Sequence, residues 1–132
     1  MRWELGQRAS FTKTVSECDV YLFAGITGDF NPVHVDERSA ENSIFGERIV
    51  HGIFVAGLIS SVIGMKLPGA GTIYLEQDAR FLLPVKIGDT VTAIVEVAEI
   101  INKKKQILKL YTKAVNQKNE TVLDGYAVVK AP

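Results

Sequence analysis

The stretch HGIFVAGLISSVIGM, residues 51–65, contains no Asp, Glu, Lys or Arg and is apolar on nearly all sides. It has the length of a helix, and a helix that is apolar all round is buried rather than amphipathic. Small residues recur every fourth position, at Gly52, Ala56, Ser60 and Gly64, and therefore stack on one face where a sheet or a ligand chain could approach the backbone. The segment predicts a long central helix.

Downstream of this helix, two-residue periodicity predicts an antiparallel meander. The residues TVTAIVEVAEI, 90–100, are rich in β-branched side chains and follow the turn pair Gly88-Asp89. Residues 106–115 and 120–130 alternate in the same way, and residues 73–83 form a fourth expected strand that ends at Pro84. The three lysines at 103–105 fit a solvated turn between two strands.

Upstream, the pattern predicts a strand, a helix and a loop. Ser16 and Asp19 make a capping box, so a helix is expected from Ser16 to a stop at Gly25 or Gly28, and a short helix near Asp36. Because the helices come early in the chain and the strands late, the sequence predicts an α+β fold. We expect residues 1–132 to form one domain, in which the apolar helix packs on a curved antiparallel sheet.

Composition excludes several classes of protein. The chain has 132 residues, 47% hydrophobic and 23% charged, with 15 Lys+Arg against 15 Asp+Glu. A net charge of +0 gives no field to attract nucleic acid or an anionic membrane, so we expect neither as a partner. The longest uncharged stretch, residues 49–65, is 17 residues long, short of the roughly 20 that span a membrane.

Cysteine and histidine counts bear on compartment and metals. A single cysteine, Cys18, cannot form an internal disulfide, and the N-terminal MRWELGQRAS does not read as a signal peptide, so we expect a cytoplasmic protein. Two histidines and one cysteine cannot supply a tetrahedral zinc site, so we expect no metal.

The sharpest chemical feature is GDFNPVH, residues 28–34. A carboxylate at Asp29 and an imidazole at His34 flank Asn31-Pro32, whose restricted backbone stiffens the loop. Such a pair suits proton transfer near neutral pH, with one group holding a water while the other relays its proton. Gly52, at the start of the apolar helix, has a free N–H that favours a developing oxyanion.

Each of these features also has a plainer interpretation. Asp29 could cap the following turn, and His34 could be a packed surface side chain. On its own, His51 fits a helix-start residue better than a catalyst, and Ser60 could bond back to its own helix.

Together these motifs resemble the MaoC-like, R-specific enoyl-CoA hydratases, also called hydratase 2. The resemblance rests on FAGITGDFNPVHVD (23–36), IVHG (49–52), the small-residue helix and FLLPVKIGD (81–89), with Thr27 in place of the commoner serine. It implies a hot-dog fold, an antiparallel sheet wrapped around a long central helix, and a homodimer. It also implies reversible addition of water to trans-2-enoyl thioesters, of coenzyme A or acyl carrier protein, without a cofactor.

The resemblance assigns a role to each candidate residue. Asp29 and His34 become the catalytic pair, Asn31 orients them, Gly52 N–H binds the thioester carbonyl, and Ser60 supports the loop. A 3-hydroxyacyl-carrier-protein dehydratase uses the same residues and stays open as an alternative. A hot-dog thioesterase fits the loop less well, and a non-catalytic acyl-thioester binder would not need both ionisable residues.

Overall fold

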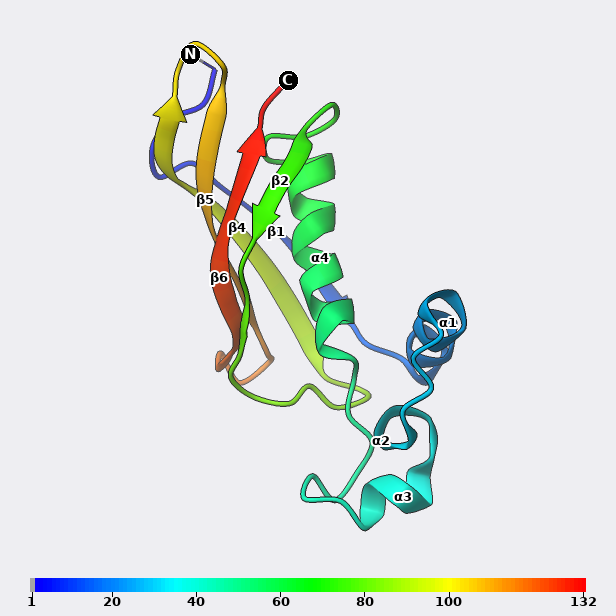
Figure 1. The fold of residues 1–132 in the computed structure, drawn as a ribbon. Coiled ribbons are helices and arrows are strands. Elements are labelled where there is room, and N and C mark those ends of the chain that lie inside the picture. The colour runs from blue at the N-terminus through cyan, green and yellow to red at the C-terminus, as the bar shows by residue number, and fades with distance from the viewer. Residues whose placement is uncertain (1) are drawn as a thin grey trace.

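A computed structural model describes residues 2–132, in which one antiparallel sheet packs against a central helix. The helices are α1 (Glu17–Thr27), α2 (Pro32–Val35), α3 (Glu37–Glu41) and α4 (Gly52–Met65). The strands are β1 (Arg8–Thr14), β2 (Ile73–Gln77), β3 (Arg80–Phe81), β4 (Thr90–Asn102), β5 (Ile107–Val115) and β6 (Thr121–Lys130). Their order is β1-β4-β5-β6-β2, with β3 also paired to β6. The α1, α2 and α3 helices gather beyond the N-terminal end of α4 (Figure 1).

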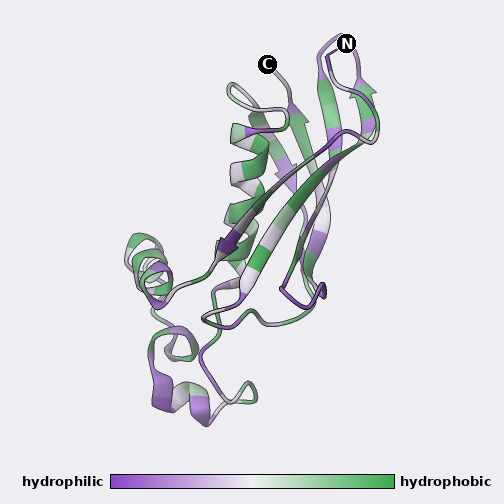
Figure 2. Cartoon of the chain, turned by 180° about the vertical axis from the view of Figure 1, so that it is seen from behind, coloured by the Kyte–Doolittle hydropathy of each residue, from purple (hydrophilic) through white to green (hydrophobic). Residues whose placement is uncertain are grey.

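The core forms between α4 and one face of the sheet, as the alternating pattern predicts. The buried side chains on the strands include Val91, Val95, Leu108, Leu110 and Ala127, and those on α4 include Val55, Ile59, Val62 and Ile63. In Figure 2 the apolar colour follows α4 and alternates along the strands, while α3 is mostly hydrophilic. The predicted α+β architecture is therefore confirmed.

The single strand expected over residues 73–83 is wrong, because the chain bends at Asp78 and divides it into β2 and β3. The bend brings the Asp78 carbonyl so close to Gly125 that a Cβ there would lie 2.2 Å from its oxygen. The Asp78 side chain then accepts the Tyr126 N–H at 2.9 Å, replacing a carbonyl of the strand ladder. Periodicity alone does not reveal this kink.

The expectation that α4 is enclosed on most sides also needs correction. Ile53 is 64% exposed and Met65 79%, because one sheet covers only one side of a helix. The small-residue stripe has a close neighbour at Gly52, where a Cβ would lie 2.7 Å from the Phe81 ring, whereas nothing lies within 4 Å at Gly64. Close approach to the backbone therefore occurs at the first glycine of the stripe and not at the last.

The N-terminal helices confirm the capping predictions and add one element. Ser16 caps α1 in a capping box with Asp19, and hydrogen bonding from the Ser16 backbone lowers the pKa of the Asp19 carboxyl. The helix ends at Gly28, whose φ of 82° is left-handed, rather than at Gly25. Asp36 caps α3, and its pKa is lowered by hydrogen bonds from Ser39. Within residues 2–132, no helix is both long and apolar enough to span a bilayer.

Candidate active site

The loop that carries Asp29 leads directly into α2, the turn of helix that the sequence did not predict. Asn31 caps α2 by accepting the Val33 N–H at 3.3 Å, and Pro32 takes the first helical position, where its missing N–H costs nothing. The Asp29 carboxylate accepts the Asn31 N–H at 3.2 Å. These local bonds set the path of the chain from Asp29 into the helical turn that carries His34.

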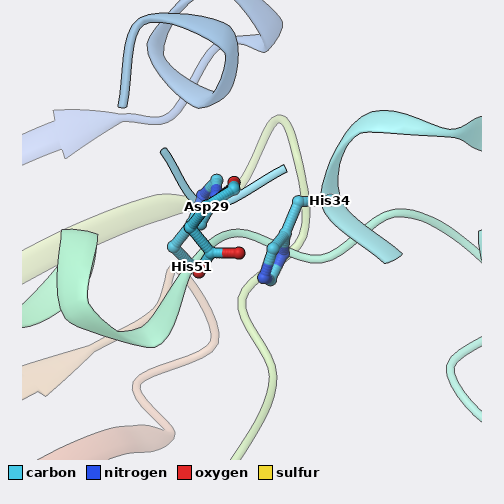
Figure 3. Close-up of side chains that lie close together, drawn as sticks. All are labelled: Asp29, His34 and His51. Carbon is cyan, nitrogen blue, oxygen red and sulfur yellow. Dashed lines mark hydrogen bonds between the residues drawn. The ribbon is translucent and has the colours of Figure 1, made fainter. Parts of the chain in front are cut away.

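Asp29, His34 and His51 form a compact cluster beside the start of α4 (Figure 3). One nitrogen of each ring and one carboxylate oxygen of Asp29 all lie within 4.8 Å of one another. The two imidazoles stack, with centroids 3.9 Å apart and planes 28° apart. Both histidines are buried while Asp29 is exposed, so the cluster has one dry side and one side open to a substrate.

Hydrogen bonds to main-chain carbonyls fix which ring nitrogen carries a proton. His34 Nδ1 lies 2.7 Å from the Ile49 carbonyl, and His51 Nε2 lies 2.9 Å from the Asp29 carbonyl. A carbonyl oxygen only accepts, so both of these nitrogens are N–H donors. His34 Nε2 is then the nitrogen left for chemistry, and His51 Nδ1 is buried without a partner among the described residues.

The sequence argument against a metal site counted only histidine and cysteine. Asp29 adds a carboxylate, and the three potential ligand atoms lie within 4.8 Å of one another. One water at hydrogen-bond length joins two polar atoms about 4.5 Å apart, so the same groups are close enough to hold a water.

Gly52 joins this cluster to an apolar cavity. The His51 carbonyl accepts the first helical N–H bonds of α4, from Phe54 and Val55, and Gly52 N–H has no acceptor among the described residues. Gly52 also lines a cavity of about 510 Å³, a size typical of small-molecule sites. The lining is otherwise apolar or main-chain: Phe45, Ile49, Val50, Ile53, Val55, Phe81, Leu82, Leu83, Pro84, Val85, Val122 and Leu123. The side chains of Asp29 and His34 lie outside this lining, next to its Gly52 end.

The predicted site residues are therefore only partly assembled. The N-terminal end of α4 brings together four of them, Asp29, Asn31, His34 and Gly52. Ser60 is half-buried two turns further along, about 12 Å from Gly52 at 1.5 Å of rise per residue. His51 starts the helix as predicted, but its burial and its contacts with Asp29 and His34 were missed. Its signals in the sequence are its place directly before Gly52 and its position in the IVHG motif.

A carboxylate, an imidazole and a helix N–H with no acceptor among the described residues lie beside an apolar cavity, an arrangement able to move protons at a polarised carbonyl compound. Residues 4–119 match the family model described as "MaoC like domain". An (R)-specific enoyl-CoA hydratase of Rhodospirillum rubrum is 48% identical over 127 residues, 96% of this chain and 87% of that protein. A 3-hydroxybutyryl-CoA dehydratase of Methylorubrum extorquens is 46% identical over 129 residues, covering 98% of this chain and 81% of that protein.

The solved structure of an (R)-hydratase from A. caviae, described as involved in PHA biosynthesis, superposes with a TM-score of 0.95. It is 42% identical and covers 99% of this chain and 98% of its own. The chain belongs to the MaoC-like family, and the predicted hot-dog fold is confirmed.

Proposed function

We propose that this protein is an R-specific enoyl-CoA hydratase, a hydro-lyase that adds water reversibly to trans-2-enoyl thioesters to give (R)-3-hydroxyacyl thioesters. The observation that carries the proposal is the meeting of Asp29, His34 and the free Gly52 N–H at one end of the apolar cavity. The relatives named as hydratases and dehydratases over nearly the whole chain support it.

In this proposal the thioester carbonyl accepts the Gly52 N–H, helped by the positive end of the α4 dipole. Polarisation makes the β-carbon electrophilic and stabilises enolate character, and an oxyanion donor of this kind contributes roughly 3 kcal/mol. Asp29 and His34 Nε2 hold one water between them. Its oxygen bonds to the β-carbon while one O–H bond of the water breaks, and that proton passes to a member of the pair. The π electrons move toward the carbonyl, and the pair then returns a proton to the α-carbon from the same face, which restores its starting protonation state.

Two further residues have supporting roles in the proposal. Asn31 holds the pair in register, because it caps the turn that carries His34 while its own N–H binds the Asp29 carboxylate. Ser60, which lies outside the cavity lining and about 12 Å from Gly52 along α4, would support a more distant part of the substrate rather than the water. No cofactor enters the proposed reaction, since the chemistry needs only proton transfer and a polarised carbonyl.

We also propose a homodimer and a cytoplasmic location. The β2 and β3 edge exposes Ile73, Leu75 and Phe81, each more than half accessible, and an apolar sheet edge of this kind needs pairing or cover. Cys18 is free and exposed, which fits a reducing compartment. Sedimentation at micromolar concentration tests the dimer, and a fully active monomer would refute it.

The deciding experiment follows the loss of enoyl absorbance with a short and a long trans-2-enoyl-CoA, with chiral analysis of the product. We expect the (R)-3-hydroxyacyl thioester. Release of free coenzyme A without hydroxyacyl product would reassign the protein as a thioesterase, and the S product would reject the proposed stereochemistry.

One enoyl carrier protein, assayed beside the coenzyme A substrates, separates the alternative named above, a 3-hydroxyacyl-carrier-protein dehydratase. Faster turnover of the carrier-protein substrate would favour that alternative. Absence of turnover with every thioester, together with binding, would indicate a non-catalytic acyl-thioester binder.

A further inference from the structure

His51 is the most buried polar side chain of the site, 2% exposed, and the proposed mechanism gives it no proton to move. Its ring nevertheless contacts both members of the proposed catalytic pair, the Asp29 main chain by a hydrogen bond and the His34 ring by stacking. We propose that His51 is a positioning residue that ties the Asp29 loop to the start of α4 and supports one face of His34. This inference rests on the proposed function.

The hydrogen bond from His51 holds the loop at Asp29, a member of the proposed catalytic pair. His51 Nε2–H donates to the Asp29 carbonyl at 2.9 Å, across 22 positions of sequence. The Asp29 N–H is held by the Thr27 hydroxyl at 3.2 Å, so both main-chain polar groups of Asp29 are occupied. The main chain of Asp29 is thereby fixed relative to His51 and so to Gly52, which directly follows His51 in the chain.

The His51 ring itself has little freedom to move. Phe23 of α1 lies at 4.9 Å from it, centroid to centroid, and His34 lies at 3.9 Å. The Phe23 ring also meets Phe54 of α4 edge-on at 5.7 Å. His51 thus joins three helices, and an imidazole confined between two rings can hold a hydrogen bond in one direction at small cost in entropy.

The His51 ring directs its hydrogen bond at the loop that carries Asp29. Its Nε2–H donates to the Asp29 carbonyl, and Nδ1 is buried with no partner among residues 2–132. Among the described residues the ring therefore has a single hydrogen-bond partner, and that partner is a main-chain group of the proposed catalytic pair.

The test compares His51→Gln with His51→Met. These side chains have the same length, but only the glutamine amide can replace the ring N–H toward the Asp29 carbonyl. We expect kcat of H51M to be about tenfold to a hundredfold below that of H51Q, the loss that follows a misplacement of about 1 Å, with nearly equal KM. Their melting temperatures should agree, because both lose the same ring contacts. Equal kcat values in the two variants, or a kcat of H51M equal to the parent's, would overturn the proposal.

Imidazole ¹⁵N NMR of the parent protein gives a second measurement that needs neither turnover nor a folded variant. The chain has two histidines, and the structure predicts an Nε2–H donor for His51 and an Nδ1–H donor for His34. A His51 ring without a proton on Nε2 would overturn the positioning role. If the parent hydrates no enoyl thioester, the proposed function fails, while this spectrum still decides the state of His51.

Discussion

The sheet with α4 and the segment from α1 to His51 are held together by different means. In the sheet, main-chain ladders and buried alternating side chains repeat along β4, β5 and β6. In the segment, single side chains hold single main-chain groups: Asn31 holds Val33, His34 holds Ile49, and His51 holds Asp29. Stability in the first region is spread over many residues, whereas geometry in the second depends on a few.

The largest effect is expected from Asp29→Asn and His34→Gln, which keep size and much of the hydrogen bonding but remove proton transfer. Each should lower turnover by about 100- to 10,000-fold while the melting temperature stays near the parent's. The double variant should be little worse than either single one, since both groups act on one water. Near-normal turnover in both single variants would show that the loop is only a structural turn. The segment from α1 to His51 would then have no catalytic role that sets it apart from the sheet.

Leu110→Ala should have the opposite effect, because it should lower the stability of the protein and leave turnover unchanged. Leu110 is fully buried on β5, in the core that β5 shares with α4. The space left by the shorter alanine side chain should therefore lower the free energy of unfolding by about 2–5 kcal/mol. Denaturant unfolding measures this loss, and kcat of the remaining folded protein should match the parent's. Lys113→Ala on the opposite face of β5 is the matched control, expected within about 0.5 kcal/mol of the parent. A lower kcat in L110A would show that the two regions are not separable.

The smallest and most discriminating effects are expected from two glycines of α4. Gly52→Ala places a methyl 2.7 Å from the Phe81 ring, so the ring must shift beside the proposed carbonyl site, and kcat/KM should fall about tenfold or more. Gly64→Ala meets nothing within 4 Å and should instead stabilise the protein by about 1 kcal/mol, with activity unchanged. Equal activity in the two variants would show that the start of α4 is not part of the site.

The same contrast explains what the sequence could predict. The strands β4, β5 and β6, the helix α4 and the capping box at Ser16 and Asp19 follow from periodicity or from local spacing, and they are confirmed. The kink at Asp78 was missed because it depends on Gly125, 47 residues away, which admits the Asp78 carbonyl. Local rules describe neighbours in sequence, not such a distant contact.

At the site, the motif identified Asp29, Asn31, His34 and Gly52, but periodicity could not show which distant groups each one contacts. His51 was missed as a partner because its contacts reach Asp29, 22 positions away, and the ring of His34. The role of α2 was missed for a simpler reason, since a single helical turn is too short to show a period.

Phe81 connects the edge of the sheet to the N-terminal end of α4. Its main chain pairs with Leu123 at the edge of the sheet, and its ring rests over Gly52 at the start of α4. An edge strand of the sheet therefore supplies the side chain that packs against the first residue of α4. Among the described strands, only β3 and β6 line the cavity, through Phe81, Val122 and Leu123.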